Sequence, residues 1–201
     1  MVSCPVSRKS NRAGNGTIAC MKVLSPVNEP VTSPAVVCRQ AVEGDIEALI
    51  QLDRVCFGRQ AWPVRAWWEV ITLPEWTTLV LTEDGWVIAA SVLLPAAPVS
   101  WLASLAVRPG SRRSGLGRAL LRKALLAART ASARWLSLEV DRANRVAVGL
   151  YRREGFGTVR RFREDGRSRL EMVHRVGRGR GVRTRSHQLE PFGLLDMMVR
   201  T

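Results

Sequence analysis

Residues 104–117 read SLAVRPGSRRSGLG and join an apolar strand pattern to an amphipathic helical pattern through a basic loop with two glycines. Backbone N–H groups at the start of a helix converge on an anion, and the helix dipole favours negative charge there. The two glycines let the backbone approach such a ligand without a Cβ atom in the way. Arg112, Arg113 and Arg118 add charged hydrogen-bond donors. Strand, loop and helix together predict a site that binds a diphosphate.

The patterns on either side of this stretch predict an α+β protein, a sandwich of helices on one mixed, mostly antiparallel sheet. Apolar runs bounded by turn residues predict strands at 35–40, 77–82, 86–94, 100–107, 134–140, 157–164 and 168–176. Apolar residues at helical spacing predict helices at 45–57, 65–73 and 143–154, besides the helix that starts in the glycine loop. Asp45 is expected near the N-cap of the first helix and Gly155 at the C-cap of the last. Because the 134–140 strand follows a helix, we expect it to pair in parallel.

Length and composition are typical of one domain with a tail at each end. The chain has 201 residues, 46% of them hydrophobic, and no apolar run reaches the roughly 18 residues of a membrane span. Residues 1–34 lack periodicity and are expected to be a disordered extension, 35–176 the folded domain, and 177–201 a basic, mobile tail. The first twenty residues lack the apolar stretch of a signal peptide, so we expect a cytoplasmic protein without membrane contact. Both Met1 and Met21 stay open as the translation start.

Positive charge is concentrated around and after the glycine loop. The net charge is +14, and 17 basic residues stand against five acidic ones within 108–170. Such a region suits an anionic ligand, and it also suits an acidic macromolecular partner. The four cysteines, at positions 4, 20, 38 and 56, lack the close pairs of a zinc site. We therefore expect free thiols and no metal.

Two sequence blocks together resemble a known family. The first is R-x-x-G-x-G at 112–117, preceded by Val107-x-Pro109 and followed by ALL at 119–121. It resembles the acetyl-CoA-binding motif of the GCN5-related N-acetyltransferases (GNAT). The second, LEVDRANRVAVGLYRREGF at 138–156, is similar to the pattern of the subgroup that acetylates protein N-termini, such as those of ribosomal proteins. The resemblance covers about 36–176 and implies the GNAT fold, acetyltransferase activity and acetyl-CoA as cosubstrate.

The resemblance also implies a role for each matching residue. Glu139 would be the general base, and Tyr151, the only tyrosine, the general acid. The cofactor would be bound by Leu105, Ala106, Val107, Arg112, Arg113, Ser114, Gly115, Leu116, Gly117, Arg118 and Asn144. Attack on a thioester needs a neutral amine, and a positioned base typically contributes about 10²–10⁴-fold. Burial in an apolar strand is expected to raise the pKa of Glu139.

Three of these residues also have a purely structural interpretation. Glu139 would then be a strand carboxylate paired with an arginine, and Tyr151 a core aromatic residue. Asn144 would be the N-cap of its helix, a role that leaves part of its side chain for a ligand.

The sequence says less about the acceptor of the acetyl group than about the fold or the cofactor. The subgroup has a tyrosine pair in the loop that shapes its peptide-binding cleft, whereas this chain has RRFRED at 160–165. Arg113 stands where glycine or glutamine is common. The N-terminal α-amine of a protein is the first hypothesis for the acceptor, and a small-molecule amine or a lysine is the alternative. A third hypothesis, from the net charge and GRGRGVRTR at 177–185, is a non-catalytic protein that contacts a ribosome or RNA through its basic tails.

Overall fold

The computed structural model describes residues 35–177, and the predictions for 1–34 and for the tail after Gly177 lie outside the described residues. The strands are β1 (Val37–Gln40), β2 (Thr77–Glu83), β3 (Trp86–Leu94), β4 (Val99–Val107), β5 (Trp135–Asp141), β6 (Gly157–Glu164) and β7 (Arg167–Arg175). The α-helices are α1 (Ile46–Phe57), α2 (Val64–Thr72), α3 (Leu116–Thr130) and α4 (Arg145–Arg153). The α+β class is confirmed, and each predicted strand and helix is present with ends within two residues of the prediction.

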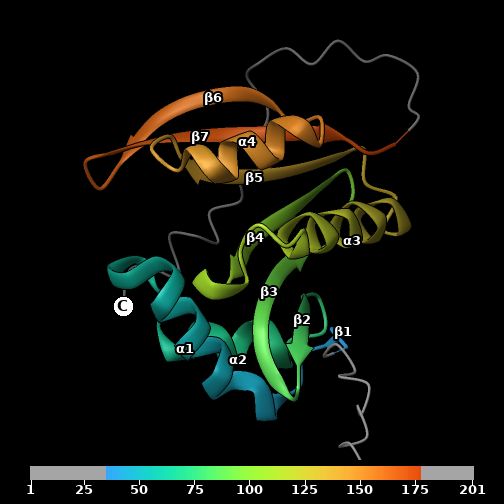
Figure 1. Ribbon diagram of the computed structural model, residues 1–201. Coiled ribbons are helices and arrows are strands. Elements are labelled where there is room, and N and C mark those ends of the chain that lie inside the picture. Colours follow the sequence, from blue (N-terminus) through green and yellow to red (C-terminus); the bar gives the residue numbers. More distant parts are fainter. Residues whose placement is uncertain (1–34, 178–201) are drawn as a thin grey trace, which may run out of the picture. The chain divides into compact units, whose positions relative to one another are not determined.

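The seven strands form one sheet in the order β1-β2-β3-β4-β5-β7-β6. Neighbouring strands are antiparallel except β4 and β5, which are parallel as expected for a strand that follows helix α3. Asp84 and Gly85 join β2 to β3 and both have positive φ, as a two-residue hairpin turn of the favoured twist requires. Asp165 and Gly166 join β6 to β7 in the same way. Figure 1 shows β1 to β4 as one group and β5 to β7 as another.

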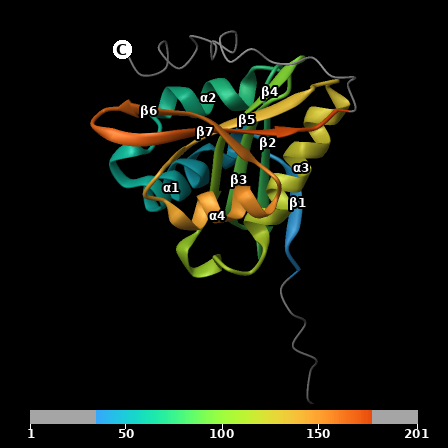
Figure 2. The ribbon, with the colours of Figure 1, turned by 90° about the horizontal axis from the view of Figure 1, so that it is seen from above.

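The helices cover the two faces of the sheet. On one face α1 and α2 pack on β2, β3 and β4 through a core that includes Leu49, Trp67 and Val80. On the other face α3 and α4 pack on β5 and β7 through a core that includes Leu121, Leu136 and Met172. Figure 2 shows α2 on one side of the strands and α4 on the other. Full burial of a side chain of this kind contributes about 1.5–3 kcal/mol, so these two cores fix the helices on their strands.

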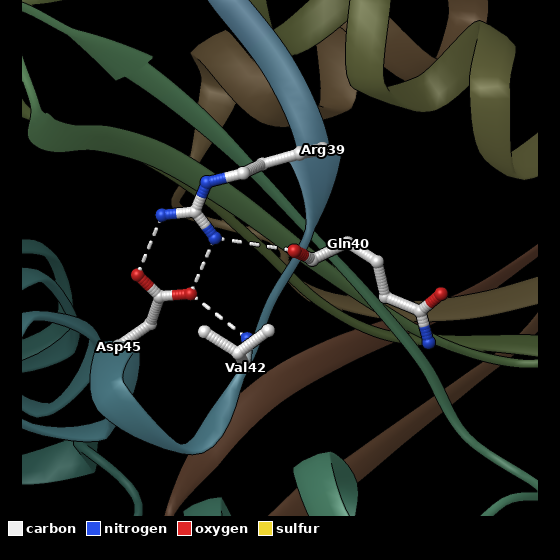
Figure 3. Close-up of polar contacts among 4 residues, drawn as sticks. All are labelled: Arg39, Gln40, Val42 and Asp45. Atoms are coloured by element: carbon white, nitrogen blue, oxygen red, sulfur yellow. Dashed lines mark hydrogen bonds and ion pairs between the residues drawn. The ribbon is translucent and has the colours of Figure 1, made fainter.

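An ion pair ties β1 to the start of α1. Asp45 precedes α1, but its carboxylate bonds to β1 and the intervening loop rather than to the first turn of the helix. It accepts from Arg39 Nη1 at 2.6 Å and Nη2 at 2.8 Å, and from the Val42 N–H at 2.9 Å (Figure 3). Arg39 also donates to the Gln40 carbonyl at 3.2 Å. The hydrogen bond from Arg39 is the main reason that the pKa of Asp45 is lowered.

The two strands at the centre of the sheet diverge. Pairing between β4 and β5 runs from Val99 and Trp135 to Leu102 and Leu138, although both strands continue beyond it (Figure 1). The register of β4 with β3 shifts at this point, which leaves Ala103 as an extra residue in β4. A bulge bends its strand and increases the local twist. β4 thus turns away from β5 directly after Leu102, and the predicted site residues of both strands lie beyond that divergence.

Candidate active site

The glycine loop of the sequence is a sharp connection between β4 and α3. The Arg108 N–H donates to the Ile88 carbonyl at 2.8 Å, which anchors the end of β4 to β3. A 3-10 turn at Pro109–Ser111 follows, and the Ser114 hydroxyl donates to the Ser111 carbonyl at 2.6 Å. Gly115 precedes α3 with φ 87°, a left-handed conformation that glycine adopts without strain. The loop thereby directs the first N–H groups of α3 toward the end of β4.

The arginines of this loop differ in what they contact. Arg112 Nε donates to the Val107 carbonyl at 3.0 Å, and the Cys56 thiol donates to the same carbonyl at 3.3 Å. Arg113 has φ 67°, which gives a physical reason for the glycine common at this place in the family. Arg118 pairs with Glu154, the residue directly after α4, and Glu154 also accepts from Arg122 Nε at 3.1 Å. Arg118 is therefore part of an ion network between α3 and α4, a contact that the sequence did not reveal.

Helix α4 forms the second wall beside this loop. Asn144 caps the helix, since its Oδ1 accepts from the Ala147 N–H at 3.1 Å, and its amide NH₂ group remains for a ligand. A Cβ atom on Gly117 would lie 3.6 Å from both Leu150 of α4 and Val107 of β4. The end of β4, the start of α3 and one face of α4 therefore meet at Gly117. Of the predicted cofactor-binding residues, Val107 and Gly117 are thus brought beside α4, and Asn144 lies at the N-terminus of that helix.

Glu139 lies on the opposite face of β5 from the α3 and α4 core. Leu136, Leu138 and Val140 alternate with it and point into that core. The side chain of Glu139 is 14% exposed, and its Oε2 accepts from Arg169 Nη2 at 3.3 Å. Burial is the main cause that raises the pKa of Glu139, while Arg169 acts in the opposite direction. The raised pKa strengthens the carboxylate as a base.

A second acidic residue faces Glu139 across the strands. Glu171 of β7 is directly opposite Glu139, is buried, and pairs with Arg160 Nε of β6 at 2.9 Å. Arg169 also bonds to Glu164 through Nη1 at 3.1 Å. Two arginines thus pair with three carboxylates and offset part of the repulsion among them. Sequence reasoning assigned no site role to Arg160, Arg169 and Glu171; Arg169 and Glu171 are two residues apart in one predicted strand and so share a face, but the sequence does not show which strand lies beside them.

Tyr151 belongs to the other face of the sheet. It is 7% exposed and packs with Leu138 and Val140, with its ring centroid 5.7 Å from that of Phe156. Burial raises the pKa of Tyr151 to about 12, so the phenol keeps its proton at neutral pH. The structural interpretations of Glu139, Tyr151 and Asn144 are all observed: an arginine pair, a core ring and an N-cap. Glu139 and Tyr151 thus lie on opposite faces of the sheet.

Other features of the described residues are few. Cys38 and Cys56 are free thiols, as predicted; Cys4 and Cys20 lie outside the described part. Residues 35–177 contain no group of three or more metal-binding side chains. No helix in that range has the length and apolar character needed to cross a membrane.

Solved structures of similar fold cover most of the chain. The ribosomal-protein-S18-alanine N-acetyltransferase of Escherichia coli is 22% identical with a TM-score of 0.66, over 75% of this chain and 99% of that one. The yncA protein of Salmonella typhimurium, solved with its cofactor acetyl-CoA, is 18% identical with a TM-score of 0.62, over 74% and 98%. The nourseothricin acetyltransferase is 25% identical with a TM-score of 0.58, over 71% and 99%.

The family to which the chain belongs follows from a match to a family model, because a shared fold alone does not show it. No curated protein matches this sequence significantly. The model of the acetyltransferase (GNAT) family matches residues 46–156, which is more than half of the chain and includes the glycine loop, β5 and α4. The chain therefore belongs to the acetyltransferase (GNAT) family and is an acetyl-CoA-dependent N-acetyltransferase.

Proposed function

We propose that this enzyme acetylates the N-terminal α-amine of a protein, such as a ribosomal protein, in the cytoplasm, and that 35–176 is its catalytic domain. The observation that carries the proposal is the position of Glu139 on β5 directly after Leu138, the last residue paired with β4, with its side chain largely buried beside Arg169. Acetyl-CoA supplies the acetyl group as a thioester. The fold neighbour that acetylates the alanine of a ribosomal protein supports this choice of acceptor.

Each residue has a proposed part in binding. The backbone of Leu105, Ala106 and Val107 holds the arm of the cofactor, and the loop Arg112, Arg113, Ser114, Gly115, Leu116, Gly117 and Arg118 holds its pyrophosphate. Asn144 binds the cofactor from the side of α4. The positive φ of Gly115 and the close approach at Gly117 support this assignment.

The chemistry needs two proton positions. Glu139 accepts a proton from the ammonium group of the acceptor, directly or through a water, and its raised pKa favours that transfer. The neutral amine that results attacks the thioester carbonyl, so that a C–N bond forms, the C–S bond breaks and the nitrogen gives up its second proton. Tyr151 holds a proton for the departing thiolate, since its own pKa of about 12 keeps the phenol protonated. Binding acetyl-CoA and the acceptor together where β4 and β5 diverge supplies much of the rate acceleration. No covalent acyl-enzyme is needed.

The acceptor is tested with a panel of peptides and free amines. Peptides with a free α-amine are expected to be acetylated at that amine, as read by mass spectrometry, and Glu139→Gln is expected to lower kcat by about 10²–10⁴-fold. Glu47→Gln, on the exposed side of α1, serves as the control. Acetylation of free amines or lysine side chains alone would overturn the N-terminal assignment.

A small-molecule amine or a lysine is the second candidate acceptor. It is favoured by residues 160–165, where the stretch that corresponds to the tyrosine pair of the subgroup contains no tyrosine and Arg160 lies over the Phe162 ring at 4.5 Å. The same panel decides between the two candidates.

A further inference from the structure

A cleft of about 900 Å³ lies on the flank of α4 that faces the β6–β7 hairpin. Its lining comes from the β5–α4 connection, from α4, from β6 and from the start of β7, and the charged part of it comprises Asp141, Arg142, Arg145, Arg152, Arg161 and Arg167. The cleft thus gathers five arginines and one carboxylate from segments that are far apart in the sequence.

The cleft adjoins Asn144, which lies between its lining residues Ala143 and Arg145, but it opens on another face of α4 from the glycine loop. Arg145, Gly149 and Arg152 recur at helical spacing and lie on one face of α4. Leu150 and Glu154 lie on the face toward α3, where Leu150 is next to Gly117 and Glu154 binds Arg118. Helix α4 therefore stands between the glycine loop and the cleft.

Most of the positive charge in the cleft is uncompensated. Arg167 Nη1 lies 3.8 Å from Asp141 Oδ2, and Asp141 Oδ1 accepts from the Ala143 N–H at 2.8 Å. The other four arginines of the cleft are all exposed, namely Arg142, Arg145, Arg152 and Arg161. Within residues 35–177 their side chains make no ion pair and no hydrogen bond. Like charges held together repel each other, so a polyanion in the cleft relieves that repulsion.

The lining indicates which polyanion fits. Guanidinium groups bind phosphate through paired N–H donors. The cleft has no aromatic side chain on which a base stacks, and its apolar members are small or recessed, such as Ala143 and Val148. Protein partners are usually anchored by buried aromatic or large apolar groups, whereas nucleic-acid interfaces are polar and strongly positive. We propose that this cleft binds the phosphodiester backbone of a nucleic acid without sequence preference.

The test measures fluorescence anisotropy of a labelled 20-nucleotide uridine RNA with the full chain at several salt concentrations. The triple variant Arg145→Ala, Arg152→Ala, Arg161→Ala is expected to bind at least about tenfold more weakly at low salt. Its slope of log affinity against log salt is expected to be less steep by about two units, because three phosphate contacts are lost. Both tails are present in each protein, so the difference reports the cleft. A thymidine DNA of the same length is expected to depend on the same three arginines.

The matched control removes the same charge elsewhere. Arg54→Ala, Lys123→Ala, Arg129→Ala takes three exposed cations from α1 and α3 and is expected to change RNA affinity by no more than about twofold. Equal losses in the two triple variants would show an effect of net charge alone and overturn the proposal. Displacement of the RNA by excess CoA would assign the cleft to the cofactor and overturn the proposal. If the triple variant lost affinity for a poly-glutamate peptide but not for RNA, the cleft would be assigned to an acidic protein, which also overturns the proposal. Unchanged thermal unfolding and CoA affinity of the cleft variant show that its fold is intact.

Discussion

Arg169 of β7 places Nη2 3.3 Å from Glu139 Oε2 and Nη1 3.1 Å from Glu164 Oε2. The proposed base is thus held by a cation that is itself held by the hairpin between β6 and β7. Arg169 lowers the pKa of Glu139, while burial and the nearby carboxylates of Glu164 and Glu171 raise it. The balance between these groups sets the pH at which Glu139 is available as a base.

Replacing Arg169 by methionine is expected to raise the pKa of Glu139 further. The acid limb of the kcat/KM profile then moves to higher pH, and Arg169→Lys restores part of the shift. Arg160→Met is the control, because Arg160 has the smallest effect on the pKa of Glu139 among the charged groups near it and pairs with Glu171. An acid limb that stays in place in Arg169→Met would show that Glu139 is not the titrating base.

Tyr151→Phe keeps the buried ring and removes the proposed acid. Because the pKa of Tyr151 is raised to about 12, the phenol is protonated throughout pH 7–10. The kcat of the variant is expected to be about 10²-fold below that of the wild type. This ratio is expected to be the same at every pH in that range. Thermal unfolding should change little, since the contact with Phe156 involves the ring. Full turnover by a folded Tyr151→Phe would remove Tyr151 from the mechanism.

The parts that sequence predicted best are local. Gly115 and the arginines around it lie within a few residues of each other, so their pattern alone predicted a helix that starts in this loop. The apolar strand pattern at 134–140 likewise predicted the burial that raises the pKa of Glu139. In each case short-range backbone geometry determines the outcome.

The parts that sequence missed depend on the order of strands. β7 lies between β5 and β6, which brings Arg169 beside Glu139 although the two are 30 residues apart. Arg118 and Glu154 are 36 residues apart and meet because α3 and α4 lie on the same face of the sheet. Such pairs follow from the packing of whole elements, which residue patterns do not specify.

Gly115→Ala is expected to strain the start of α3. A φ of 87° is unfavourable for a residue with a Cβ atom, and the left-handed conformation costs about 1–2 kcal/mol. The melting temperature and the affinity for acetyl-CoA, measured by calorimetry, should both fall. Gly110→Ala in the same connection is the control, because its φ is not positive and a Cβ there has open space. Equal affinities in the two variants would contradict a role for the Gly115 conformation in the cofactor loop.

Asp45→Asn is expected to weaken the connection between β1 and α1. It removes the charge that accepts from both Nη atoms of Arg39, and hydrogen bonds to charged groups contribute about 1.5–3 kcal/mol. The folded-state pKa of Asp45 is lowered, so its contribution is present at neutral pH and is lost as the pH falls through that lowered value. Urea unfolding should therefore show a gap between wild type and Asp45→Asn at pH 7 that narrows toward acid pH. Glu47→Gln, at the exposed start of α1, should leave the unfolding free energy within about 0.5 kcal/mol, and a gap for Asp45→Asn that widens in acid would contradict the assignment.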